Sequence, residues 1–122
     1  MLSIWGLWAF QDDGTHLRLF IQSPGNPGPI TGWLEDMNNH VLPMQGVYDG
    51  LTKRVAFGAA RAPGDRLVVR SYAGALIIRP GDLLWGLAGT WSGFGFTFDR
   101  AREIKDLIHD DGGWYALDRQ MP

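Results

Sequence analysis

The chain has 122 residues, about the length of one domain, and its composition of 45% hydrophobic and 20% charged residues excludes a disordered chain. Its eleven basic and thirteen acidic residues are scattered singly or in adjacent pairs and give a net charge of −2, which excludes the basic surface that nucleic-acid binding requires. Cysteine is absent, so disulfides, thiol catalysis and thiolate metal sites are excluded. We therefore expect a single folded domain over residues 1–122.

The N-terminal segment, residues 1–5, has neither the basic start nor the apolar run of a signal peptide. No apolar stretch approaches the roughly 18 residues that a membrane helix needs. These features predict a soluble, cytoplasmic protein without a membrane partner.

Turn residues recur at short spacing from the first strand candidate onward. Glycine supplies the positive φ of hairpin turns, proline fixes the first turn position, and Asp or Asn bonds its own backbone. Such signals occur at 12–14, 24–29, 38–39, 49–50, 63–65 and 80–82. This rhythm predicts an all-β chain.

Segments of strand composition lie between the turns. Leu17, Leu19 and Ile21 alternate with mainly polar neighbours, as a half-buried strand requires. Eight such segments occur, at about 3–10, 16–22, 30–35, 41–48, 54–60, 66–78, 83–91 and 94–98. They predict an eight-stranded antiparallel up-and-down β-barrel over about residues 3–98, with a β-sandwich as the alternative. The seventeen glycines, many inside strand segments, favour the barrel because glycine permits strong bending.

After Phe98 the apolar spacing becomes helical, at Ala101, Ile104, Leu107 and Ile108. Asp99 is a candidate N-cap and Gly112 a stop signal. We expect a short C-terminal helix within about residues 99–122 that covers one barrel end, with 113–117 as a further candidate strand.

Neither catalytic nor metal-binding motifs are found in the sequence. The three histidines, His16, His40 and His109, fall in distant segments without a second ligand at metal-binding spacing. No serine stands in a nucleophile-elbow context. We therefore predict no catalytic residue, no metal site and no cofactor.

The aromatic inventory is the strongest functional signal. Packing is the ordinary role of such rings, but six Trp exceed what a small barrel needs, and eight-stranded barrels also hold small ligands at their mouths. We predict a non-enzymatic protein that binds a small apolar or amphipathic ligand, with selection by polar side chains. The candidate ligand-binding residues are Trp8, Thr15, Trp33, Tyr48, Phe57, Trp85, Thr90 and Trp91.

Two other functions stay open. In one, the surplus aromatic residues cover the interface of a homo-oligomer that holds no small ligand. In the other, a barrel of isomerase or lyase type uses His16, Asp36 or Glu35 as acid or base.

Several short stretches resemble the calycin barrels, and avidin-like proteins in particular. The stretches are Gly6-Leu7-Trp8 with its following turn, Ile30-Thr31-Gly32-Trp33, Met44 to Asp49, and Leu84-Trp85-Gly86-Leu87. The resemblance implies an eight-stranded barrel that assembles through its outer strands, with Trp85 and Phe57 as walls of a ligand site. Avidin-like proteins recognise biotin through a first-strand Asn and a Ser in the turn, where this chain has Phe10 and Thr15.

Overall fold

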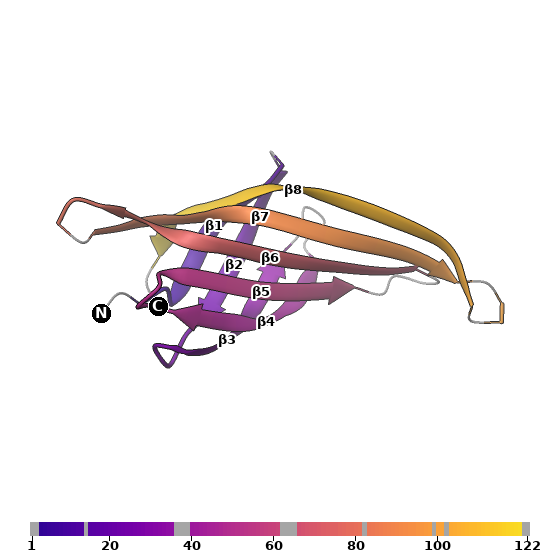
Figure 1. Cartoon of the computed structure of the whole chain (residues 1–122), viewed down its shortest axis with the longest axis horizontal. Coiled ribbons are helices and arrows are strands. Elements are labelled where there is room, and N and C mark those ends of the chain that lie inside the picture. The colour runs from indigo at the N-terminus through magenta and orange to yellow at the C-terminus, as the bar shows by residue number, and fades with distance from the viewer. Residues whose placement is uncertain are drawn as a thin grey trace.

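A computed structural model describes residues 3–13, 15–35, 40–61, 66–81, 83–98, 100–101 and 103–120. Eight antiparallel strands pair in chain order and close on themselves as a barrel (Figure 1). They are β1 (Gly6–Asp12), β2 (Thr15–Gln22), β3 (Gly28–Glu35), β4 (Val41–Asp49), β5 (Arg54–Arg61), β6 (Arg66–Arg79), β7 (Leu83–Phe98) and β8 (Ile104–Gln120). The predicted eight-stranded antiparallel barrel is confirmed, and pairing of β8 with β1 excludes the sandwich. This architecture is compatible with a calycin-type fold.

Strand length divides the barrel into two parts. Strands β1 to β5 have 7 to 9 residues, whereas β6, β7 and β8 have 14, 16 and 17. The three long strands extend beyond the others at the right of Figure 1. We call the paired segments 66–70, 93–98 and 104–110 the arm.

The predicted C-terminal helix is wrong, because residues 104–120 form β8. The helical spacing of Leu107 and Ile108 arises by chance: the two side chains lie on opposite faces of a strand, and both are exposed. Farther along β8, Trp114 and Ala116 are buried with exposed neighbours between them, which is the period of a strand. The two candidates at 83–91 and 94–98 are one continuous strand, β7.

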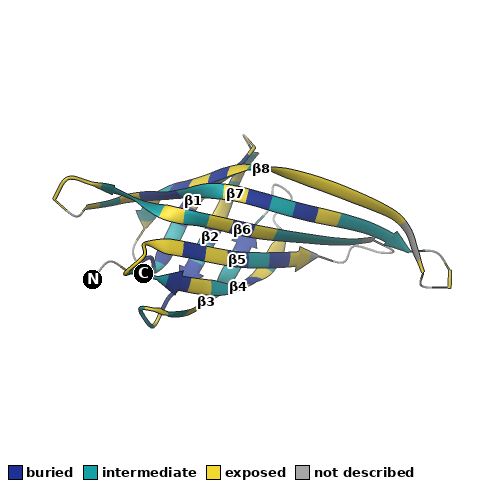
Figure 2. Ribbon diagram, in the orientation of Figure 1, coloured by how far each residue is buried: buried dark blue, intermediate teal, exposed yellow. Residues whose placement is uncertain are grey.

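The inner faces of the strands form the hydrophobic core. Along β1, β4 and β5 each inward residue is more buried than its outward neighbours, and Figure 2 shows this alternation on β5. Strand β8 is largely exposed in the arm. The core comprises Ile4, Trp8, Phe10, Leu19, Ile21, Ile30, Leu34, Met44, Tyr48, Val55, Phe57, Tyr72, Leu87, Trp91, Trp114 and Ala116.

Glycine allows neighbouring strands to approach closely at two inward positions. A Cβ at Gly46 would lie 2.0 Å from the carbonyl oxygen of Ala56, and one at Gly89 would lie 1.9 Å from that of Ala73. No other residue fits these backbones, so glycine is required there for the close approach of the strands. Among the described residues, no helix has the length and apolar character to span a membrane.

Candidate functional site

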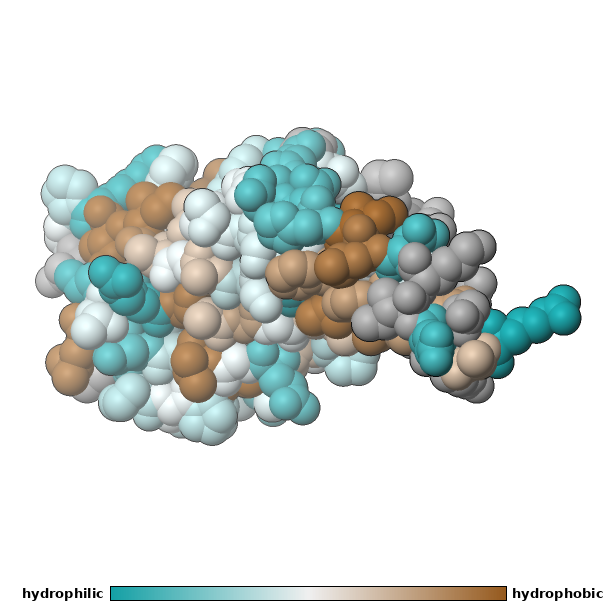
Figure 3. Space-filling model, turned by 45° about the vertical axis from the view of Figure 1, so that its right-hand side comes forward, coloured by the Kyte–Doolittle hydropathy of each residue, from teal (hydrophilic) through white to brown (hydrophobic). Residues whose placement is uncertain are grey.

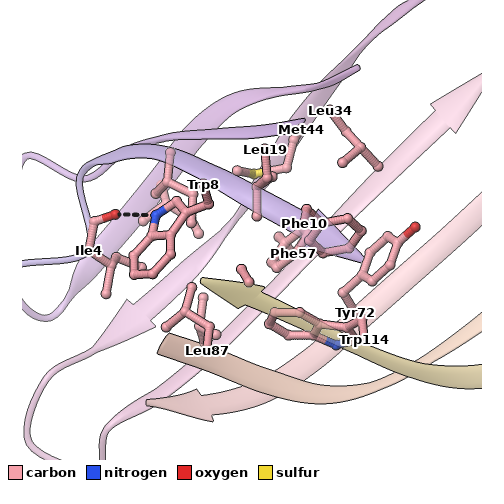
Figure 4. Packing of buried hydrophobic residues seen from close by; sticks show 14 of the residues in the cluster. Ile4, Trp8, Phe10, Leu19, Leu34, Met44, Phe57, Tyr72, Leu87 and Trp114 are labelled. Carbon is pink, nitrogen blue, oxygen red and sulfur yellow. Dashed lines mark hydrogen bonds between the residues drawn. The ribbon is translucent and has the colours of Figure 1, made fainter. Parts of the chain in front are cut away.

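The middle of the barrel is filled by four aromatic rings from four strands. Phe10 of β1, Phe57 of β5, Tyr72 of β6 and Trp114 of β8 all contact one another, with ring centroids 4.9–6.5 Å apart. Figure 4 shows these rings pointing toward one another from opposite walls. The Trp114 indole N–H donates to the carbonyl of Thr90 at 3.0 Å, which fixes the ring. The barrel centre is therefore packed, and a ligand must bind toward an end.

The end near the N-terminus is closed by the residues that precede β1. Ile4 is fully buried, and its carbonyl accepts a hydrogen bond from the Trp8 indole at 3.1 Å (Figure 4). The Arg119 guanidinium lies 5.4 Å from the Trp8 ring centroid, and burial lowers the pKa of Arg119. These contacts plug that end and leave the opposite end as the mouth.

A polar network lies at the mouth, where β1 ends. Asp12 is buried, and its Oδ2 accepts hydrogen bonds from Arg70 Nη1 and, at 3.1 Å, from the Tyr72 hydroxyl. Burial raises the pKa of the Asp12 carboxyl, opposed by the positive charge of Arg70. Burial and the neighbouring Asp12 also raise the pKa of Tyr72, which therefore stays a neutral donor at pH 7.

The Trp91 side chain packs against the Arg70 end of this network. The Arg70 guanidinium lies 4.3 Å from the Trp91 ring centroid, a cation–π contact. Trp91 is only 4% exposed, and its indole nitrogen is buried without a hydrogen-bond partner among the described residues. Buried indole N–H groups normally have an acceptor, so this donor, which has none among the described residues, is available to an acceptor on a bound molecule.

An open hollow of about 220 Å³ lies beside Trp91 on the inner face of the arm. Its floor is the backbone of β7 at Gly93 and Gly95, and Val68 and Ile108 stand opposite each other across Gly95. A Cβ at Gly95 would meet only Ile108, at 3.9 Å. We call this hollow the trough; its lining residues are Val68, Arg70, Trp91, Gly93, Phe94, Gly95, Phe96, Thr97, Asp106, Ile108 and Asp110.

Charge in the trough is mainly negative. Asp106 and Asp110 of β8 line it, and the Thr97 hydroxyl donates to Asp106 at 3.2 Å. The cation of the trough, Arg70, is paired with Asp12. The trough thus combines apolar walls and a Trp ring with two further carboxylates, which suits an amphipathic molecule with a cationic or donor-rich head.

Five of the eight predicted site residues face the barrel interior. Trp8, Tyr48, Phe57 and Trp91 are buried there, and Thr15 pairs with Asp12 across the β1–β2 turn and is half-buried at the mouth. Trp91 and Thr15 are thus placed toward the mouth. Trp8 is part of the plug at the opposite end.

Three predicted residues lie on the outside. Trp33 packs against Phe20 with ring centroids 5.7 Å apart. Trp85 is 44% exposed with the Arg79 guanidinium 4.8 Å from its ring centroid, and Thr90 is exposed. The structure does not bring these three to the mouth, and assembly through such exposed rings stays a prediction.

Sequence reasoning missed the mouth network. Asp12 looked like an ordinary turn carboxylate, and its partner Arg70 lies 58 residues away. The available signal was the spacing of Arg70 and Tyr72, which places both side chains on one face of a strand. Gly93 and Gly95 carried a second signal, because two alternate glycines remove side chains from the same strand face.

Of the residues considered for acid–base chemistry, the two that the structure describes, Glu35 and His16, contact other side chains. Glu35 accepts two hydrogen bonds from Arg18, the shorter 2.9 Å, and His16 Nδ1 lies 3.1 Å from Gln11 Nε2 on the exposed surface. Asp36 lies outside the described residues. Among the described residues, no group of three or more His, Cys, Asp or Glu side chains is placed to hold a metal ion.

Fold and site together define a closed, eight-stranded antiparallel β-barrel with a packed aromatic interior and an open trough at one end. Comparison of the chain with protein-family models, with curated proteins and with solved structures gives no match.

Proposed function

We propose that this protein is a non-enzymatic binding protein that holds a small amphipathic ligand in the trough at the barrel mouth. The observation that carries the proposal is Trp91, a buried ring that lines an open hollow and has an indole N–H without a partner among the described residues. A ligand acceptor would satisfy that donor while the apolar part of the ligand packs against Val68 and Ile108.

The volume and charge of the trough limit the class of ligand that it can hold. A volume of about 220 Å³ lies below the roughly 300–1,000 Å³ of typical drug-sized sites, which favours a fragment-sized molecule. Asp106 and Asp110 favour a cationic head over an anionic one. Packed rings in the barrel centre exclude the deep insertion of a long chain.

Three probes with one apolar body test the proposal: phenethylamine, 2-phenylethanol and phenylacetate, titrated while tryptophan emission is recorded. We expect saturable quenching that is strongest with the amine and weakest with the carboxylate, since Asp106 and Asp110 line the trough and form no ion pair with the other described residues. Absence of saturable quenching with all three probes would disprove the proposal.

Gly95→Leu provides the matched steric test. The position tolerates a side chain locally, because an added Cβ meets only Ile108, so the leucine fills the trough of the folded barrel. We expect affinity for phenethylamine to fall by about tenfold or more. Gly113→Leu is the control, since Gly113 is exposed on the outer face and an added Cβ meets only the Gly89 carbonyl oxygen at 3.7 Å. Equal affinity of the two variants for phenethylamine would show that the trough is not the binding site.

A further inference from the structure

Strand β8 has an open edge along the arm. It pairs with β7 from Ile104 to Ala116, but with β1 only from Trp114 onward. Within the described part of the chain, residues 104–112 therefore have no strand on their second side. Figure 1 shows β8 as the outer strand of the arm. An open edge presents backbone donors and acceptors to a further strand.

The hydrogen bonds at the base of the arm show which groups point outward. The Gly113 N–H donates to Asp13 Oδ1 and its carbonyl accepts from the Asp13 N–H, both at 3.2 Å, so Gly113 faces the edge. Because these groups alternate along a strand, Asp111, His109 and Leu107 face the same way. The Asp111 N–H is already capped by Asp110 Oδ1 at 2.9 Å. The N–H and carbonyl groups of His109 and Leu107 have no partner among the described residues and remain for a further strand.

The two faces of this edge differ in chemistry. On the inner face, Asp106 and Asp110 flank Ile108, which is 63% exposed. On the outer face, Leu107 is 61% exposed and lies across from Phe96, which stacks on Phe94 with centroids 6.3 Å apart. Apolar surface appears toward the right of Figure 3, where the arm comes forward. An added strand would therefore meet Asp106 and Asp110 around Ile108 on the inner face. On the outer face it would meet Leu107, the His109 ring beside Phe94, and Asp111 near the base of the arm.

We propose that the β8 edge binds an extended segment of another protein by β-strand addition, with Lys or Arg side chains at alternate positions. Strand addition gains affinity from main-chain hydrogen bonds and specificity from alternate side chains. The basic side chains would lie beside Asp106 and Asp110, and the intervening apolar ones beside Leu107.

Charge favours a basic partner over a second copy of this chain. Residues 103–113 contain the acidic Glu103, Asp106, Asp110 and Asp111 against the single Lys105. Two copies joined edge to edge would bring the inner-face carboxylates of both together, whereas a basic strand neutralises them. The nearby Arg70 does not do so, because it donates to Asp12.

The probe is a seven-residue peptide in which Lys and Val alternate, and its counterpart carries Glu in place of Lys. Calorimetric titration of the full chain should give saturable binding of the Lys peptide, weakened by salt, and none of the Glu peptide. Light scattering at the same concentrations reports the mass. Equal binding of both peptides, or a stable dimer with no peptide binding, would overturn the proposal.

Leu107→Pro is the sharpest variant, because it removes an N–H that faces the open edge and leaves the bonds to β7 in place. Leu107→Ala keeps that N–H and is its matched control. We expect the proline variant to bind the Lys peptide about tenfold more weakly than the alanine variant. Should the proline variant fail to fold, Asp106→Asn with Asp110→Asn tests the charge contribution and should weaken binding similarly.

Gly95→Leu separates this edge from the trough. The leucine fills the floor of the trough on β7, whereas the edge lies on the far side of β8. Peptide binding should persist in this variant even if it abolishes binding of phenethylamine. Unchanged peptide affinity in both the proline and the double asparagine variants would show that the peptide binds elsewhere.

Discussion

The most constrained side chain at the mouth is Asp12. Its carboxylate is 3% exposed, and a buried charge is tolerated only where partners replace the lost water. Arg70 and Tyr72 supply those partners, and the 39% exposed Arg70 side chain also reaches solvent. The network thus connects the end of β1 to β6, a strand with which β1 does not pair.

Replacing Arg70 by methionine tests this network. Arg70→Met keeps much of the apolar stem but leaves Asp12 buried without its cation. The pKa of Asp12, already raised by burial, then rises further because the positive charge of Arg70 no longer opposes that effect. We expect a loss of about 2 kcal/mol in urea denaturation, below the roughly 3–5 kcal/mol of a fully buried pair because Arg70 is partly exposed.

The control for this loss is the double variant with Asp12→Asn. Removing the unpaired carboxylate should recover part of the stability, because the neutral amide needs no counter-charge. If Arg70→Met costs the same with and without Asp12→Asn, then Arg70 stabilises the barrel by packing on Trp91 rather than by its charge.

At the scale of the element, β8 combines two environments in one strand. Residues 114–116 pair with both β7 and β1, and β8 continues to Gln120 along β1. Within the described part of the chain, residues 104–112 pair only with β7. Sequence reasoning expected a helix here because 99–112 contains both helical spacing and cap residues. The strand forms because β8 closes the barrel with β1, and because β7 offers a partner strand from Leu87 to Phe98. Local spacing contains no information about that partner.

Hydrogen exchange followed by NMR should reveal the two environments of β8. We expect the amides of Leu107 and His109, which face the open edge, to exchange rapidly, while those of Asp106 and Ile108 are protected by pairing with β7. Ala116, between two strands, should be protected as well. Uniform protection of the amides from 106 to 110 would contradict the open edge, because every amide would then have a hydrogen-bond partner.

For the whole molecule, the alternating pattern and the turn residues were sufficient to predict the antiparallel barrel. The predicted number of eight strands agrees with the structure only because two candidates merge into β7 and the expected helix is β8. The pattern also predicted that most aromatic residues pack inside, as Trp8, Tyr48 and Phe57 do. It could not predict which rings meet, since Phe10 and Trp114 come from opposite ends of the chain and become neighbours only when β8 pairs with β1. The mouth network could not be predicted either, because barrel closure brings Asp12 close to Arg70 and Tyr72, which are distant in the sequence.

The four-ring cluster should make unfolding of the barrel cooperative, because its members come from β1, β5, β6 and β8 and join opposite walls. Trp114 touches the other three rings, so Trp114→Ala leaves a cavity at their centre and should cost about 3–5 kcal/mol. Far-UV circular dichroism and tryptophan emission should report one shared urea midpoint, lowered in the variant. Trp33→Ala is the control, since Trp33 lies on the outer face and contacts Phe20, and it should cost much less. Separate midpoints for the two signals would show that the arm or the N-terminal plug unfolds independently of the barrel.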